Sequence, residues 1–236
     1  MTDPTELPRR FYKAVTLGPL DGGHAVLLDG RTPRSPGGQR LILPSEALAA
    51  LIAAEWETQV EVIRLASMPA TRLAYTALEK VGPAHDEVAA EIARYANSDV
   101  LCYWAEAPRE LVNQEAEQWG PLLAWADEAL SLKFHRAHGI VHRAQPPETV
   151  AGVRALAEAA DDFALAGLAH ATPLLGSAIL ALALQRGRLG GEAAFDLSRL
   201  DEAYQESQWG VDEEAAERTA RLRAEAAMLE AWFRAL

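Results

Sequence analysis

The sequence predicts an α+β protein in which a small N-terminal domain of antiparallel sheet plus helix precedes a larger all-α C-terminal domain. Strand-like segments and hairpin-type turns are concentrated before Pro44, whereas helical periodicity begins at Pro69 and continues to the C-terminus. The Met68-Pro69 step separates the two patterns. We therefore predict one domain of residues 1–68 and a second of residues 69–236.

The N-terminal region alternates between β-favouring segments and turn signals. Residues 11–17 are rich in aromatic and β-branched side chains, which is typical of a strand. Asp29-Gly30 is a strong hairpin signal, and strands are expected on either side of it at residues 24–28 and 31–34. A further short strand is expected at residues 40–43, which completes a small antiparallel sheet.

The first helix is predicted from its cap and its apolar face. Ser45 is suited to cap a helix that carries Leu48, Leu51, Ile52 and Trp56 on one side. We expect that face to cover the sheet and to bury the ring of Trp56.

The rest of the chain is predicted to form helices separated by proline and glycine. Residues 99–105 are a short apolar run that fits an extended or a helical segment. Thr172-Pro173 has the cap-then-proline order that begins a helix, and it divides the uncharged stretch from Phe163 to Leu184. The helix after it falls short of the roughly 20 residues that a bilayer requires, so a buried core helix is predicted. Helices are expected at residues 69–81, 83–97, 109–132, 147–160, 161–170, 173–186 and 191–199, then in an acidic segment that Gly210 ends, and at 212–236.

Composition and charge restrict the classes of partner. The 236 residues carry a net charge of −12, which argues against binding of nucleic acid and against adhesion to anionic lipid. The single cysteine, Cys102, excludes an internal disulfide and fits a reducing compartment. No apolar run follows the arginines near the N-terminus, so we expect no signal peptide, no membrane insertion and a cytoplasmic protein.

The acidic segment, residues 198–217, combines carboxylates, glutamines, a tyrosine and a tryptophan. Leu200, Ala203, Tyr204 and Ser207 fall at the spacing of one buried stripe, which leaves the acidic side chains mostly on the other side. The pattern fits either a solvated helix face or a recognition surface with aromatic anchors. On the second interpretation, the partner-binding residues are Asp201, Glu202, Tyr204, Gln205, Gln208 and Trp209.

The signals for catalytic chemistry are weak. His135, His138 and His142 would share one side of a continuous helix, where neutral imidazoles can ligate zinc, so a metal-dependent hydrolase is the alternative hypothesis. Gly139 weakens such a helix, and ordinary surface or packing histidines are the plainer interpretation. The sequence has no nucleophile elbow, P-loop, dinucleotide fingerprint or H-E-x-x-H motif. We accordingly assign no catalytic residue, no metal ligand and no cofactor.

Several short motifs follow one another along the chain from residue 11 to residue 210. They are Phe11-Tyr12-Lys13, Leu28-Asp29-Gly30-Arg31-Thr32-Pro33, Pro44-Ser45, Glu55-Trp56 with Gln59, Met68-Pro69-Ala70-Thr71-Arg72-Leu73-Ala74, Ser98-Asp99 with Cys102-Tyr103, and Leu200-Asp201-Glu202 with Tyr204-Gln205 and Gln208-Trp209-Gly210. Together they resemble the F1-ATPase assembly chaperone family that is specific for the α subunit, the ATP synthase F1 assembly factor 2 type.

The resemblance implies a bacterial member of a family whose eukaryotic members reside in the mitochondrial matrix. It implies an N-terminal α+β domain, a helical C-terminal domain and no catalytic activity. The implied partner is newly made α subunit of the ATP synthase head, held until the β subunit replaces the chaperone, and we expect a monomer when the chaperone is free. An acidic residue that is important in the family corresponds here to Asp201 or Glu202. Residues 211–215 depart from the mitochondrial members, which carry a run containing Trp and His there.

Overall fold

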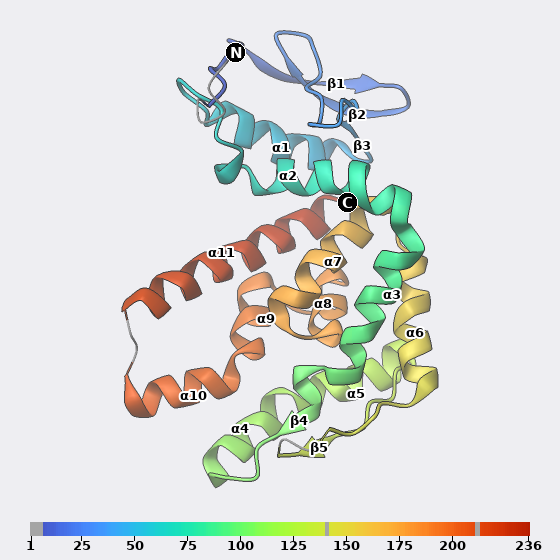
Figure 1. Cartoon of the computed structure of the whole chain (residues 1–236), viewed down its shortest axis with the longest axis vertical. Coiled ribbons are helices and arrows are strands. Elements are labelled where there is room, and N and C mark those ends of the chain that lie inside the picture. Colours follow the sequence, from blue (N-terminus) through green and yellow to red (C-terminus); the bar gives the residue numbers. More distant parts are fainter. Residues whose placement is uncertain (1–6, 140–141, 211–212) are drawn as a thin grey trace.

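A computed structural model describes residues 7–139, 142–210 and 213–236, and it has the predicted α+β fold. A small sheet with two helices beneath it forms an N-terminal layer, which lies against a larger helical body (Figure 1). The last helix, α11 (Glu213–Ala235), runs from the edge of the body to the underside of this layer. The C-terminus therefore lies where the layer and the body meet (Figure 1).

The β-hairpin of the sheet is closed by an earlier Asp-Gly pair than predicted. The strands are β1 (Val15–Leu20), β2 (Gly23–Leu28) and β3 (Ile42–Leu43), antiparallel and in that order. The connection between β1 and β2 is Asp21-Gly22, whose φ values of 50° and 84° suit the two-residue turn of a hairpin. Asp29-Gly30 also turns the chain, but residues 31–34 form only isolated bridges, so the predicted hairpin there is wrong. Pro33 has no N–H group to extend a ladder, which is a physical reason for the difference.

The first strand also begins later than predicted. The backbone N–H groups of Lys13 and Ala14 donate to the Asp29 carboxylate at 3.1 and 2.9 Å. Because a side chain satisfies these groups, the predicted strand of residues 11–17 becomes regular only at Val15.

Helix α1 (Glu46–Glu57) covers the sheet as predicted. Ser45 caps it, since its Oγ accepts from the N–H of Leu48 at 3.0 Å. Trp56 is 4% exposed, and its ring meets that of Tyr12 edge-on at 5.8 Å between centroids. The Tyr12 hydroxyl donates to the carbonyl of Trp56 at 2.6 Å, so the segment before β1 is fastened to the end of α1. The predicted burial of Trp56 is confirmed.

Glu55 joins α1 to the next helix, α2 (Pro69–Thr76). Its carboxylate accepts from the N–H groups of Ala70 and Thr71 at 2.7 and 2.8 Å and from the Thr71 hydroxyl at 2.7 Å. These N–H groups have no partner within the first turn of a helix, so a carboxylate there is a favourable cap. Burial nevertheless raises the pKa of Glu55.

The body is almost entirely helical. A π-helical segment, Ala77–Val81, leads from α2 into it, and two short parallel strands, β4 (Tyr103–Trp104) and β5 (Ala137–His138), pair at its far end. Its helices, besides α11, are α3 (His85–Tyr95), α4 (Arg109–Gln118), α5 (Gly120–Leu130), α6 (Pro147–Glu158), α7 (Asp162–Leu175), α8 (Ala178–Gln185), α9 (Gly191–Ser198) and α10 (Leu200–Trp209). Short 3₁₀ turns lie at Leu65–Ser67, Gly82–Ala84, Ala96–Ser98 and Val100–Cys102.

Two predicted helix boundaries are wrong. Helix α7 continues through Pro173, which lies in its last turn, and ends at Gly176 with a left-handed φ of 59°. Ser177 then caps α8, so the break falls later than Thr172-Pro173. The predicted helix of residues 109–132 is divided at Trp119, after which Pro121 enters the first turn of α5.

Helix α8 is the centre of the core, because every residue from Ala178 to Leu184 is buried. Asp99 is also fully buried, and its carboxylate accepts from the N–H groups of Leu101 at 3.1 Å and Ile179 at 3.0 Å. Burial raises the pKa of Asp99 to about 6, and it also raises the pKa of the neighbouring Cys102 thiol. Within the described ranges, none of the helices combines the length and the hydropathy needed to cross a membrane.

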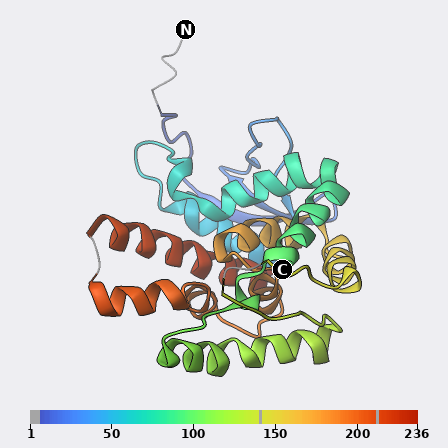
Figure 2. The ribbon, with the colours of Figure 1, turned by 60° about the horizontal axis from the view of Figure 1, so that its bottom comes forward.

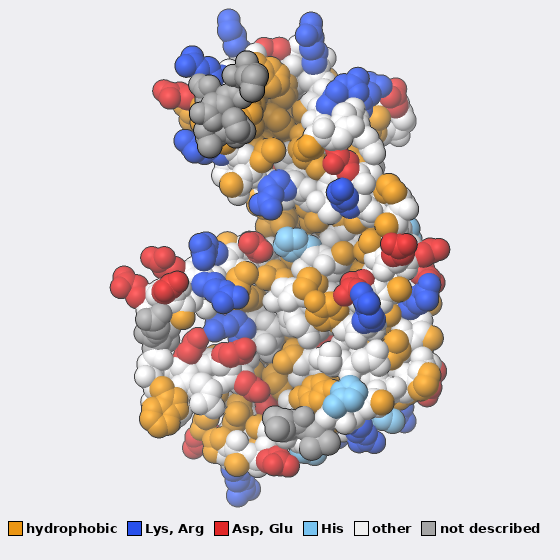
Figure 3. All heavy atoms as spheres, in the orientation of Figure 1, with side chains coloured by type: hydrophobic (Ala, Val, Ile, Leu, Met, Phe, Trp, Pro, Cys, Tyr) orange, Lys and Arg blue, Asp and Glu red, His pale blue; other side chains and the backbone are white. Residues whose placement is uncertain are grey.

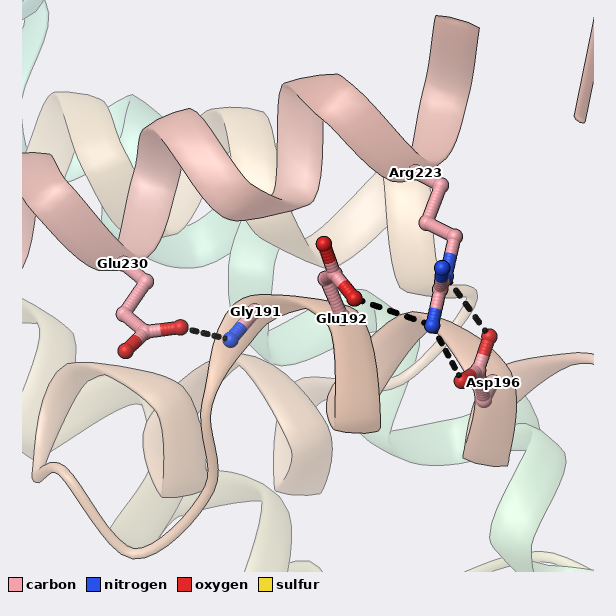
Figure 4. Close-up of polar contacts among 5 residues, drawn as sticks. All are labelled: Gly191, Glu192, Asp196, Arg223 and Glu230. Carbon is pink, nitrogen blue, oxygen red and sulfur yellow. Dashed lines mark hydrogen bonds and ion pairs between the residues drawn. The ribbon is translucent and has the colours of Figure 1, made fainter. Parts of the chain in front are cut away.

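Helix α11 is approached closely by α9 (Figure 4). A Cβ placed on Gly191 would lie 2.0 Å from the carbonyl oxygen of Ala226, so only glycine fits there. The N–H of Gly191 donates to Glu230 at 2.6 Å, and Arg223 binds both oxygens of Asp196 at 3.2 and 3.0 Å. These contacts fix the C-terminal half of α11 against the body.

We predict that Gly191→Ala destabilises the protein, because the new methyl group would clash with backbone atoms of α11, which cannot move aside as a side chain can. The loss of unfolding free energy is expected at the upper end of the range of about 1–3 kcal/mol for overpacking. Chemical denaturation measures it, with Gly120→Ala as the control, since a Cβ there meets nothing within 4 Å. Equal stability of the two variants would show that α9 and α11 are not packed this closely.

Candidate functional site

The acidic helix α10 is attached to the body mainly at its base. Leu200 is 8% exposed, and α10 contacts α4 and α9. Arg199, between α9 and α10, donates to Glu206 at 2.7 Å and lies over the ring of Phe195 at 5.7 Å. Both side chains of this ion pair are partly buried, and Arg199 links the base of α10 to α9 through its contacts with Glu206 and Phe195.

The predicted buried stripe of α10 is largely wrong. Of its members only Leu200 is buried, Tyr204 is partly buried, and Ala203 and Ser207 are exposed. The reason is visible in Figures 1 and 2, where α10 and the first turns of α11 extend away from the body as a pair of helices. With no second layer to cover it, most of α10 faces solvent.

The exposed side of α10 carries most of the predicted partner-binding residues. Trp209, at the end of the helix, is 85% exposed, the largest exposed fraction among the large apolar side chains in the described part of the chain. Glu202, Gln205 and Gln208 are also exposed. A tryptophan left in water beside polar groups is typical of a binding surface rather than of a solvated helix face.

A groove of about 710 Å³ lies between α10 and α11, and we call it the α10–α11 groove. Glu202 lines it, as do Arg199, Arg218 and Arg221. The end of α7 and the Phe195 side chain of α9 also contribute to its lining. Among the described residues Glu202 has no cation within ion-pair distance, so its charge is available to a bound molecule.

Asp201 differs from Glu202 in its surroundings. It is partly buried at the side of Glu115, a residue of α4 whose side chain has no exposed surface. Glu115 accepts from the N–H of Ala105 through both oxygens, at 3.1 and 2.8 Å. The Oδ1 atom of Asp201 is buried and finds no donor among the described residues. Burial, and then Asp201, raise the pKa of Glu115 to about 7.

A shared proton accounts for this pair of carboxyl groups. When Glu115 is protonated, its O–H group can donate to Asp201, which satisfies the Oδ1 atom and removes the repulsion between two charges. Asp201 therefore connects α10 to α4, whereas Glu202 faces outward. The six predicted residues lie on one helix but not on one face.

The three histidines do not form the predicted constellation. Residues 135–139 are not helical: His138 lies in β5, and the N–H of His135 donates to Gln145 at 2.7 Å. His142 instead accepts from, or donates to, the Tyr103 hydroxyl at 2.8 Å. Among the described residues no group of three or more His, Cys, Asp and Glu side chains is placed to hold a metal ion. The alternative hypothesis of a histidine-based hydrolase thus lacks the helix that it requires.

The fold and the sequence together define a known class of protein. Residues 9–127, half of the chain, match the family model described as ATP12 chaperone protein, and the chain belongs to that family. The family consists of chaperones that act in ATP synthase assembly.

Solved structures and a curated relative agree with this assignment. Atp12 from Paracoccus denitrificans has a TM-score of 0.91 and 43% identity, over 96% of this chain and 97% of that one. An aspartate-to-lysine variant of Atp12p from P. denitrificans has a TM-score of 0.91 and 42% identity over the same shares. The mitochondrial atp12 protein of Schizosaccharomyces pombe is 28% identical over an alignment of 221 residues, which covers 89% of this chain and 76% of that protein.

Sequence reasoning missed Glu115 and the arginines of the α10–α11 groove. Glu115 lies four residues after Leu111 on α4, a spacing that places both on one helix face, and both are buried. The spacing therefore indicated that Glu115 lies on the buried face of α4. Arg218 and Arg221 gave no such signal, because their position beside α10 depends on how α11 folds back.

We predict that Glu115→Gln stabilises the protein increasingly as pH rises. The wild-type carboxyl has a folded pKa of about 7, above its ordinary value of 4.5, so the folded state retains a proton that the unfolded state releases. Stability from this group is therefore lost as pH rises from about 4.5 to about 7. Glutamine stays neutral, can donate to Asp201 and can still accept from Ala105.

Melting temperatures between about pH 5 and pH 8 measure this effect, and the difference between variant and wild type should grow in favour of the variant. Glu117→Gln, at an exposed position on the same helix, is the control and should give a constant difference. Parallel melting profiles for wild type and Glu115→Gln would contradict the shared proton.

Proposed function

We propose that this protein binds the unassembled α subunit of F1-ATPase and holds it until the β subunit takes its place. The role is non-catalytic, and the chaperone acts as a monomer in the bacterial cytoplasm. The observation that carries the proposal is an 85% exposed Trp209 on a projecting helix beside the α10–α11 groove, in a chain of the ATP12 chaperone family.

The chemistry of this surface suits binding of an unassembled subunit. Such a subunit exposes an interface that is partly apolar and partly charged, and it aggregates unless that interface is covered. Trp209 offers a large apolar contact area, and Gln205 and Gln208 offer hydrogen-bonding groups beside it. Glu202, which has no cation at ion-pair distance in the described part of the chain, supplies a carboxylate that complements a basic group on the client.

The arrangement also allows release. The proposed contacts come from one helix that projects from the body and from the groove at its side. A subunit that forms a larger interface with the client can therefore displace the chaperone. An exposed charge such as Glu202 affects the association rate and the choice of partner more than it affects affinity. Replacement by the β subunit requires no energy source beyond this competition.

Asp201 and Tyr204 are assigned supporting roles. Asp201 meets Glu115, and Tyr204 is partly buried, so both help to set the orientation of α10. Substitution of Asp201 is thus expected to act on binding partly through the angle of the helix. Glu202 and Trp209 are expected to act by direct contact.

We predict that Trp209→Ala and Glu202→Lys each weaken the capture of α subunit without unfolding the chaperone. Removal of an aromatic anchor is expected to cost about 2 kcal/mol or more of binding free energy. Charge reversal at position 202 places a positive charge against a basic patch of the client, which weakens binding. The loss of the favourable interaction between Glu202 and the helix dipole costs only about 0.3–1 kcal/mol of folding stability.

Pull-down of purified α subunit and a melting curve for each variant test this. Glu128→Lys is the matched control, because Glu128 is an exposed carboxylate on α5 and does not line the groove. Undiminished capture by both variants would exclude this surface as the binding site.

A further inference from the structure

A second groove lies between the N-terminal layer and the body. It has a volume of about 610 Å³ and is formed by α2, α7 and α11, so we call it the α2–α11 groove. Figure 3 shows the surface hollowed at this level, between the upper layer and the body. Leu73, Ala166 and Met228 give the groove an apolar lining, and Arg72, His170 and Arg221 contribute polar side chains.

The charges of this groove differ from those of the chain as a whole. The protein has a net charge of −12, yet the groove is lined by two arginines and a single carboxylate, Glu225. Glu225 lies 3.4 Å from the Nε2 atom of His170. Within the described ranges neither Arg72 nor Arg221 has a carboxylate at ion-pair distance. Two guanidinium groups beside an apolar floor are suited to a carboxylate that is attached to apolar side chains.

The two grooves adjoin along α11. Arg221 lines both of them, so a client segment that crosses α11 at this residue can contact both grooves. This continuity favours a second segment of the same client over an unrelated occupant. A segment bound here would contact the N-terminal layer through α2 and the body through α7 and α11.

We propose that the α2–α11 groove binds an acidic, apolar segment of the client subunit, whose carboxylate pairs with Arg72 and Arg221. This inference rests on the proposed function and extends it, because it gives the client a second contact, made by Arg72 and Arg221, beside the contact made by Glu202. Glu202 meets a basic group of the client, and the arginines meet an acidic one. Two contacts of opposite sign also fix the direction in which the client lies.

Binding of purified, unassembled α subunit to variants of the full chain tests the proposal. Arg72→Glu should weaken binding about tenfold or more, since it opposes the client carboxylate with a like charge. Ala224→Trp, at an exposed lining position on α11, should weaken it similarly by filling the groove. Lys133→Glu has the same change of charge at an exposed position outside the groove and should bind as wild type does. Melting curves should remain close to that of wild type for all three.

A photo-cross-linker at Thr76, which lines the groove, identifies the occupant. Cross-linking to an α-subunit peptide that contains Asp or Glu supports the proposal, whereas cross-linking to a second copy of this chain overturns it. If wild type and Arg72→Glu bind α subunit equally while Glu202→Lys does not, the groove proposal fails and the proposed function stands. If wild type captures no α subunit at all, both fail.

Discussion

The close packing of α11 against α9 and α7 is the constraint on which the rest of the structure depends. Gly191 lets α9 reach the backbone of α11 at Ala226, and a Cβ on Gly167 would lie 2.6 Å from the ring of Phe233. Helix α9 thus packs on the backbone of α11 more closely than any larger residue would allow, and α7 packs closely on the side chain of Phe233. The end of α11 also receives the hydroxyl of Ser45, which donates to the carbonyl of Ala235 while capping α1. One helix therefore joins the N-terminal layer to the body.

This arrangement divides α11 into a buried half and an exposed half. Its C-terminal half is buried at Ala226, Leu229 and Trp232, and it serves as part of the core. Its N-terminal half is mostly exposed and extends with α10 away from the body. Both grooves use α11 as a wall, so its buried half anchors the surfaces that the projecting half presents. An exposed tryptophan is tolerated there because the core elsewhere is large enough to stabilise the fold.

The sequence was most informative where local chemistry decides the structure. Ser45 capped α1 as predicted, and Trp56 was buried beneath the sheet, because a cap and an apolar face act within one helix. Both Asp-Gly pairs turn the chain, but the strands pair across Asp21-Gly22, whereas Pro33 follows Asp29-Gly30 and cannot extend a ladder there. Pro173 lies within the last turn of α7, and the helix ends at the left-handed Gly176, which is the stronger termination signal.

The candidate site was predictable only in part. The acidic residues and Trp209 do lie together on α10, but the pattern suggested a buried stripe where most of the helix faces solvent. Burial depends on neighbours, and the neighbours of α10 come from α4 and α9. Glu115 and Asp201 belong to different helices, so no local period could relate them. The α2–α11 groove combines three separate segments, and only the folded chain shows it.

Hydrogen–deuterium exchange of the chaperone, alone and with purified α subunit, tests the central claim most directly. If α10 and the first turns of α11 bind the client, amide exchange in Leu200–Trp209 should slow in the complex, while α6 at the far side of the body should be unchanged. Protection of the sheet or of α6 with none in α10 would contradict the account, because the client would then bind a different surface.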